Sequence, residues 1–272
     1  MGGVGVDVSA NVGGMNERAH HSESTAAKET AAVAGTAVGT AVTATEDAAP
    51  ATESTDDAAF RDRFAAMMRN RRSHRKFLPD ALPEDEVREL LDLVMTSPSA
   101  FNMQARAVVR IDDPDVRAAV HAAARKQRQV LEAPLLLAFV AEPDGWEDTF
   151  DEVASQYLAS GRWDDSFAAE KRDRIAGFQK QRRDLGRSRE YALRDATIAA
   201  SFAMLAAEAR GWATSPMTGF DEEALKAAIG ADDSARDVSV ALLLAVGRPA
   251  GAPKDPGRLP LERRVYVDEY PL

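Results

Sequence analysis

Residues 71–77 read RRSHRKF, and this short stretch does most to decide which fold and which ligand the sequence implies. It places Arg71, Arg72, Ser73 and Arg75 within five positions. The planar donor fork of arginine matches phosphate oxygens, and a serine hydroxyl adds a further hydrogen bond, so a phosphate-bearing ligand is the natural partner. The alternative is a solvated basic patch at a helix end. Spacing alone leaves both interpretations open.

Residues 97–104 read SPSAFNMQ and form the second informative stretch. Pro98 is expected to end a helix, and Ser99, Asn102 and Gln104 then place hydroxyl and amide groups in the following loop. Amides both donate and accept hydrogen bonds, which suits the edge of a heterocycle or a ribityl chain. An ordinary helix-capping turn is the alternative interpretation.

Around these stretches, apolar periodicity predicts many helices separated by a few strands. Helices are expected over residues 60–68, 83–94, 115–130, 191–210 and 221–229, with one or two exposed helices in the charged segment 145–189. The helix over 191–210 is expected to be largely buried and to stop at Gly211. Strands are expected over 107–111, 135–140, 212–215 and 238–246, and residues 259–267 predict one more strand or an arm. Because the domain lacks a G-x-G-x-x-G or Walker-type loop, we favour an α+β sandwich over a Rossmann fold.

Composition divides the 272-residue chain into two parts. Residues 1–57 contain no Phe, Trp, Tyr, Leu or Ile, so they cannot bury enough apolar surface to offset their ordering entropy. We predict a disordered acidic tail over 1–57 and one folded domain over 58–272. The tail carries a net charge of −7 and the whole chain −10, which leaves about −3 on the domain and gives no support to nucleic-acid binding.

The same composition excludes several kinds of site. The chain has no cysteine, which rules out disulfides, thiolate chemistry, zinc-thiolate sites and iron–sulfur clusters, and we expect no metal site. No run approaches the ~18 apolar residues of a membrane span, and the tail fits neither a secretory signal nor a transit peptide. A cytoplasmic location is therefore expected. Met15 is an alternative start of translation, and the role of the tail stays open.

The two stretches, taken with three later ones, resemble the FMN-dependent nitroreductase family of NAD(P)H-dependent oxidoreductases. The later pieces are PMTGF at 216–220, Val246-Gly247 and RLPL at 258–261. Together they extend the resemblance over about residues 60 to 270. It implies an α-β-α sandwich with a central mixed β-sheet, and a homodimer with a domain-swapped C-terminal arm and FMN in a cleft at the subunit interface.

The resemblance also assigns roles by position. It implies that Arg71, Ser73 and Arg258 bind the FMN phosphate. Arg75 matches the cationic position near the pyrimidine edge of the flavin, and Arg72 a neighbouring backbone or ribityl contact. The residues expected to reach the flavin from the partner subunit are Pro98, Ser99, Ala100, Asn102 and Gln104.

A third group is expected to pack over the flavin ring near its reactive nitrogen: Pro216, Met217, Thr218 and Gly219. The position of Gln129 contributes in some relatives. No residue is expected to act as a covalent catalyst, because the chemistry occurs at flavin N5, with Arg75 and Thr218 in support. A fixed cation such as Arg75 stabilises the negative charge that a reduced flavin gathers.

The implied function is hydride transfer from NAD(P)H through FMN to a nitroaromatic, quinone or similar small-molecule acceptor. Two alternatives stay open: a flavoenzyme of this fold with another task, such as a substrate dehydrogenase or oxidase, a dehalogenase or a flavin-consuming enzyme, and a flavin-binding protein without turnover. The sequence does not distinguish NADH from NADPH or name the acceptor.

Three features bear on how far the resemblance extends. Ala105 and Arg106 replace the family's usual Pro-Trp pair, and Thr218 stands where an acidic residue or glycine is common. Residues 145–189 are either a lid over the substrate face or a helical excursion whose aromatic residues make core contacts.

Overall fold

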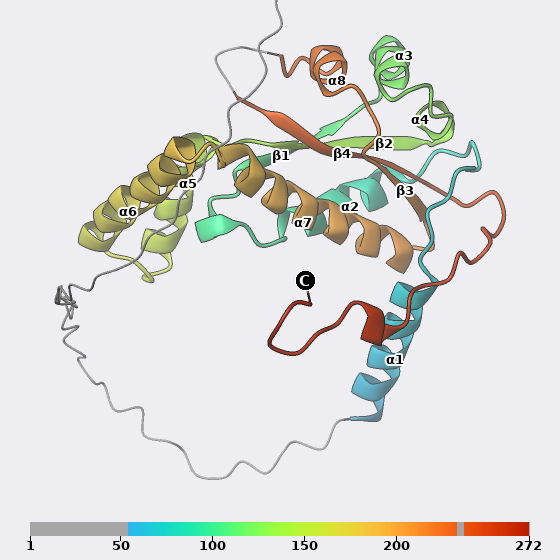
Figure 1. The fold of residues 1–272 in the computed structure, drawn as a ribbon, viewed down its shortest axis with the longest axis horizontal. Coiled ribbons are helices and arrows are strands. Elements are labelled where there is room, and N and C mark those ends of the chain that lie inside the picture. The colour runs from blue at the N-terminus through green and yellow to red at the C-terminus, as the bar shows by residue number, and fades with distance from the viewer. Residues whose placement is uncertain (1–53, 233–236, 272) are drawn as a thin grey trace, which may run out of the picture. The chain divides into compact units, whose positions relative to one another are not determined.

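The described part of the chain is built around a single β-sheet of four strands. The computed structural model describes residues 54–232 and 237–271, so the tail predicted over 1–57 lies outside the described residues up to residue 53. The strands are β1 (Arg106–Arg110), β2 (Leu135–Ala141), β3 (Ala213–Met217) and β4 (Ser239–Gly247). They form one sheet in the order β1-β2-β4-β3 (Figure 1). All of β2 is buried, as expected for a central strand covered on both faces.

The sheet is antiparallel throughout its named strands, so the expectation of a mixed sheet is wrong for the described chain. Parallel pairing is confined to the isolated bridge between Ser73 and Thr214. Of the strand or arm expected over 259–267, the strand is wrong for the described chain, because this exposed segment contains only a short 3₁₀ turn, Leu261–Arg263, and the arm stays a prediction. The segment's β-branched residues favour a strand, but a strand requires a neighbouring backbone to pair with, and the described chain offers it none.

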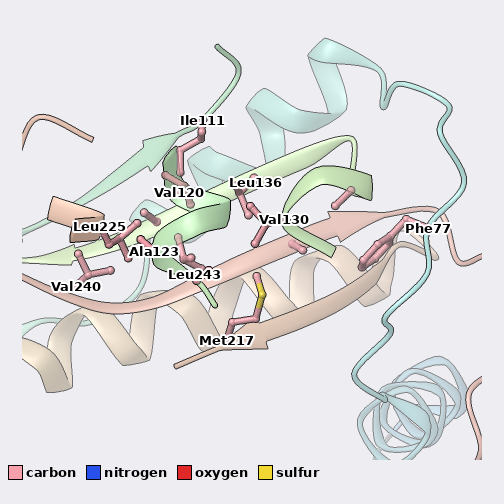
Figure 2. Packing of buried hydrophobic residues seen from close by; sticks show 14 of the residues in the cluster. Phe77, Ile111, Val120, Ala123, Val130, Leu136, Met217, Leu225, Val240 and Leu243 are labelled. Atoms are coloured by element: carbon pink, nitrogen blue, oxygen red, sulfur yellow. The ribbon is translucent and has the colours of Figure 1, made fainter. Parts of the chain in front are cut away.

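Helices cover both faces of the sheet (Figure 1). On one face lie α3 (Pro114–Ala123), α4 (Gln129–Glu132) and α8 (Glu222–Ala228), and on the other α2 (Glu84–Met95) and α7 (Ser188–Ala209). Alternate residues of β2 serve the two layers: Leu136 packs with the first group and Leu137 with the second. Figure 2 shows the first layer, with Val120 and Leu225 from the helices meeting Leu243 of β4.

Helix boundaries follow from local capping chemistry. The first helix, α1 (Thr55–Asn70), begins where the Ser54 hydroxyl accepts the Asp57 N–H at 3.1 Å. It therefore starts before the helix expected over residues 60–68 and before residue 58, the predicted start of the domain. The single helix expected over 115–130 is instead two, because Arg125 and Lys126 adopt φ values of 54° and 58° that no helix accommodates.

α7 buries one face only. That face is lined with alanines at helical spacing: Ala192, Ala196, Ala199, Ala200, Ala203 and Ala207. The larger Phe202 and Leu205 instead line an open apolar hollow with α1, so the expectation of a helix buried on most sides is wrong for this chain alone. Gly211 ends the helix as predicted, with a left-handed φ of 71°.

Two further helices, α5 (Trp146–Ala159) and α6 (Asp165–Asp184), form the excursion predicted within 145–189. A short 3₁₀ turn, Ala100–Asn102, lies between α2 and β1. Within the part of the chain that the structure describes, no helix combines the length and apolarity required to cross a membrane.

Gly247 ends β4 where the backbone passes close to Pro134 and Phe77. A Cβ placed there would lie 2.5 Å from Pro134 Cδ and 3.1 Å from Phe77 Cδ1. Gly247→Ala therefore forces neighbouring groups apart, and we expect it to lower the free energy of unfolding by about 1–3 kcal/mol, measured by urea denaturation at fixed protein concentration.

Gly177→Ala is the matched control. Gly177 lies inside α6, and a Cβ there would meet no heavy atom within 4 Å. The exchange should raise stability by about 0.5–1 kcal/mol because alanine favours the helix. Equal destabilisation by the two substitutions would contradict the close-approach explanation.

Candidate functional site

The arginine segment leaves α1 and is fixed at both ends. At its start, the Arg71 N–H donates to the Met67 carbonyl at 3.0 Å and closes the helix. The chain then runs beside β3, where Ser73 bridges Thr214 and the His74 N–H donates to the Thr214 carbonyl at 2.9 Å. At its far end, Phe77 enters the core (Figure 2). The backbone that presents the arginines is therefore held in place.

The four polar side chains of this segment differ in exposure. Arg71 and Arg72 are half-buried, whereas Ser73 and Arg75 are exposed. Arg71 Nη1 is buried and has no hydrogen-bond partner among the described residues. Since a buried arginine donor is costly unless paired, this atom calls for an acceptor such as a phosphate oxygen.

Arg258 comes close to this segment from the C-terminal part of the chain. Arg72 Nη2 lies 2.6 Å from Asp255 Oδ2, and both residues line a shallow hollow of about 440 Å³ with Arg69 and Arg258. Arg258 and Arg72 thus line the same hollow, and the shared phosphate role of Arg258 with Arg71 and Ser73 stays a prediction. Arg258 itself is exposed.

The charge of Arg71 acts on two titratable neighbours. Burial raises the pKa of the Glu208 carboxyl, and the Arg71 charge opposes that rise. Burial also lowers the pKa of His74, with the Arg71 charge adding to the effect. Glu208 Oε1 and Thr214 Oγ1 are, like Arg71 Nη1, buried without a partner among the described residues. Sequence reasoning missed Glu208, which carries no signal beyond its place in a helical pattern.

The turn after β3 carries the third predicted group. Pro216 and Met217 are the last residues of β3, and Thr218 and Gly219 follow in an exposed turn. The Met217 side chain is buried in the core layer of Figure 2, so it is not available to a ligand at the turn. Thr218 and Gly219 are thus the accessible members of this group.

Two glutamines support that turn. Gln127 Nε2 donates to the Gly219 carbonyl at 3.3 Å, and Gln129 Nε2 donates to Gln127 Oε1 at 3.2 Å. Gln129 was predicted on resemblance, and it lies buried behind Gln127 rather than at the surface. Gln127 was not predicted, because its segment reads as continuous helix in the sequence.

The residues of 97–104 form a tightly bonded loop. The Ala100 N–H donates to Asp195 Oδ2 on α7 at 3.0 Å, and the Gln104 N–H donates to Ser99 Oγ at 2.9 Å. Asn102 Nδ2 donates to the Tyr157 hydroxyl at 3.3 Å. Pro98 and Asn102 are exposed, and the other three predicted residues are half-buried.

One chain does not bring this loop to the arginine segment. The loop contacts α7 at Asp195, whereas Arg71 acts on Glu208 of the same helix. These two positions are 13 residues apart, which corresponds to about 20 Å along an α-helix. The predicted binding residues therefore form two separate groups in the described chain.

The aromatic residues of α5 and α6 divide between two environments. Trp146 and Phe150 are buried in a cluster with Met103 and Ala105, as a helical excursion with its own core requires. Phe178, by contrast, is 39% exposed and packs against Phe101 of the loop at 5.5 Å between ring centroids. Core contacts thus account for part of the excursion, and the lid interpretation stays a prediction for the remainder.

No cluster of metal-ligating side chains occurs within residues 54–232 and 237–271. The residues predicted to bind the cofactor offer guanidinium, hydroxyl, amide and backbone groups, which suit anions and heterocycles.

Comparison with known proteins gives consistent matches. A family model described as "Nitroreductase family" matches residues 68–248. A Thermus thermophilus protein named NADH dehydrogenase is 33% identical over 195 residues, which are 72% of this chain and 91% of that protein. MhqN of Bacillus subtilis, provisionally named an NAD(P)H nitroreductase, is 26% identical over 208 residues, which are 76% of this chain and 97% of that protein. A protein of Exiguobacterium sibiricum solved in complex with FMN has a TM-score of 0.64 at 22% identity, covering 75% of this chain and 96% of that one.

Proposed function

This chain belongs to the nitroreductase family, and from that premise we propose an FMN-dependent oxidoreductase that passes hydride from NAD(P)H to a nitroaromatic, quinone or similar acceptor. Its enzyme class, an oxidoreductase, follows from the family. The observation that carries the proposal is the buried Arg71 Nη1, which has no acceptor among the described residues, in a segment where Ser73 and Arg75 are exposed. A cytoplasmic location stays a prediction.

The residues present fit the cofactor. A phosphate group would satisfy the orphaned donor of Arg71 and accept from the Ser73 hydroxyl, with Arg258 adding charge. Arg72 would hold its place through Asp255. When bound, FMN supplies the acceptance and donation of hydride at its N5.

The remaining residues orient the ring and tune its electrostatics. Arg75 offers an exposed fixed charge, which favours the reduced form of a flavin whose pyrimidine edge lies beside it. The exposed Thr218-Gly219 turn offers backbone N–H donors, and Gln127 holds the turn through the Gly219 carbonyl. These roles need no covalent nucleophile.

A homodimer would complete the site. The partner's loop 97–104 would supply the residues that this chain holds against a different part of α7 from its own arginine segment. An open apolar hollow of about 680 Å³, lined by Phe60, Phe64, Phe202 and Leu205 among others, supports an interface on α1 and α7. The C-terminal segment exposes Leu259, Leu261, Val267 and Tyr270, which supports its docking on a partner as an arm.

Cofactor loading and turnover test this proposal. The purified protein should retain the visible absorbance of flavin after FMN addition and gel filtration. It should then oxidise NADH or NADPH faster when a simple quinone or nitroaromatic is added, with free FMN at equal concentration as the control. Protein that stays colourless contradicts FMN binding, and bound flavin without nicotinamide oxidation favours a flavin-binding protein or an enzyme with another task.

A further inference from the structure

Arg106 is unusual as the first residue of the edge strand β1, because an arginine that is only 4% exposed is rare. The family pattern described above has a tryptophan here. Arg106 Nη2 donates to the Ser97 carbonyl at 2.7 Å, to the Ser97 hydroxyl at 2.8 Å and to the Met95 carbonyl at 3.2 Å. One guanidinium nitrogen, Nη2, thus holds the end of α2, where unpaired carbonyls and the helix dipole favour a cation. Arg106 Nε and Nη1 are buried without a hydrogen-bond partner among the described residues.

The loop that follows α2 has a backbone that needs such support. Phe101, Asn102 and Gln104 have φ values of 55°, 58° and 54°, in the left-handed region that residues with a side chain rarely adopt. Three such residues within four positions persist only where surrounding contacts over-determine the conformation. The Arg106 clamp fixes the loop's entry, and the Arg106 N–H bonded to the Gln104 carbonyl at 2.7 Å fixes its exit.

Asp195 fixes the middle of the same loop from α7. Its carboxylate accepts the Ala100 N–H at 3.0 Å, so the left-handed residues directly follow a bonded position. Burial lowers the pKa of Arg106, and the Asp195 carboxylate opposes this shift only in part. Arg106 and Asp195 thus hold different parts of the loop backbone, Arg106 at the Ser97 carbonyl and Asp195 at the Ala100 N–H.

We propose that Arg106 and Asp195 are a pair of positioning residues that hold loop 97–104 in the shape that presents its hydroxyl and amide groups to the flavin. The pair replaces the packing of a buried aromatic side chain with hydrogen bonds to the loop's own backbone. This inference rests on the proposed FMN site for its consequence, but the positioning itself is a property of the chain without cofactor.

The test compares Arg106→Met with a matched control, Arg117→Met. Arg117 is also a carbonyl clamp: its Nη1 lies 2.6 Å from the Ala133 carbonyl and its Nη2 2.8 Å from the Ile111 carbonyl, near α3 and remote from the loop's contacts. Both variants lose a partly buried arginine, so both are expected to lower the melting temperature. Only a positioning role distinguishes them at the loop.

Hydrogen–deuterium exchange of the cofactor-free proteins is the first readout. Arg106→Met should raise exchange of the 99–104 amides at least about tenfold over wild type, as local opening becomes easier, and Arg117→Met should leave these amides unchanged. Asp195→Asn keeps an acceptor oxygen for the Ala100 N–H but removes the charge, and it should raise exchange less. If Arg106→Met does not fold, Arg106→Gln, which removes the charge and shortens the reach to the Ser97 and Met95 carbonyls, takes its place with the same expected direction.

FMN binding and reduction are the second readout. Misplacement of the loop should weaken FMN binding and slow flavin bleaching by NADH about 10- to 100-fold in Arg106→Met, with Arg117→Met close to wild type. Equal loop exchange in the two variants overturns the inference, whatever their FMN affinity. Wild-type protein that binds no FMN overturns the proposed function instead, and the exchange comparison still decides whether Arg106 positions the loop.

Discussion

Arg71→Ala is expected to weaken FMN binding by about 10- to 100-fold. Hydrogen bonds to a charged group contribute about 1.5–3 kcal/mol, and each 1.4 kcal/mol corresponds to a factor of ten in affinity. Arg71 is half-buried, and its Nη1 lacks an acceptor among the described residues. That nitrogen can therefore donate to a phosphate without breaking an existing hydrogen bond. Titration of flavin fluorescence at constant salt measures the change.

Two further arginine variants show whether the effect is specific. Arg110→Ala is the control. Arg110 lies on β1, at the opposite edge of the sheet from β3, and forms salt bridges with Asp112 and Glu84. It should leave FMN affinity unchanged. Arg75→Ala should weaken binding less than Arg71→Ala but also slow flavin reduction, because its charge supports the reduced ring. Affinity in Arg71→Ala equal to that in Arg110→Ala would remove the phosphate assignment.

Phe77→Ala is expected to lower the free energy of unfolding by about 3–5 kcal/mol, since it removes a large side chain from a packed core. Phe77 is 7% exposed, belongs to the core layer of Figure 2, and bridges Pro249 through its backbone. Because it also ends the arginine segment, its loss should weaken FMN binding even where the protein remains folded. Urea denaturation at fixed protein concentration measures stability, and a flavin titration measures binding.

Phe178→Ala is the comparison for this substitution. The Phe178 ring is partly exposed on α6 and contacts Phe101, so its removal should cost about 1 kcal/mol or less and leave the core intact. If both phenylalanine variants unfold at the same urea concentration, Phe77 is not the anchor described above.

The buried strands were predictable because their physical signal is local. Residues 135–140 are a continuous apolar run and residues 238–246 are apolar except for Ser239, and β2 and β4 lie within one residue of these ranges. A strand covered on both faces has no polar face, so its run stands out in the sequence. Gly211 was equally readable, since a left-handed helix stop favours glycine.

Features that depend on distant or external contacts were not predictable. The break at Arg125 and Lys126 involves two residues that favour helices, so their propensity gave no warning. Residues 259–267 have strand-forming side chains but no strand partner in the described chain. Phe202 and Leu205 suggested full burial, yet both are half-buried and line an open hollow in the described chain.

In the candidate site too, predictability depends on whether a residue's role follows from the local sequence or from a distant contact. Arg71, Ser73 and the turn at Thr218 were proposed from the family resemblance, because residue type and spacing alone also fit a solvated basic patch. Gln127 was not, because its contact with Gly219 joins segments 92 positions apart. The clamp made by Arg106 was visible in the sequence only as a departure from the family pattern, since its partners are backbone carbonyls, which carry no sequence signal.

Anaerobic mixing of the FMN-loaded protein with a nicotinamide tests the central claim most directly. The visible flavin absorbance should disappear on addition of NADH or NADPH and return when a quinone or nitroaromatic acceptor follows, with Arg75→Ala bleaching more slowly than wild type. Flavin that stays bound and coloured in excess of both nicotinamides would contradict an NAD(P)H-dependent oxidoreductase.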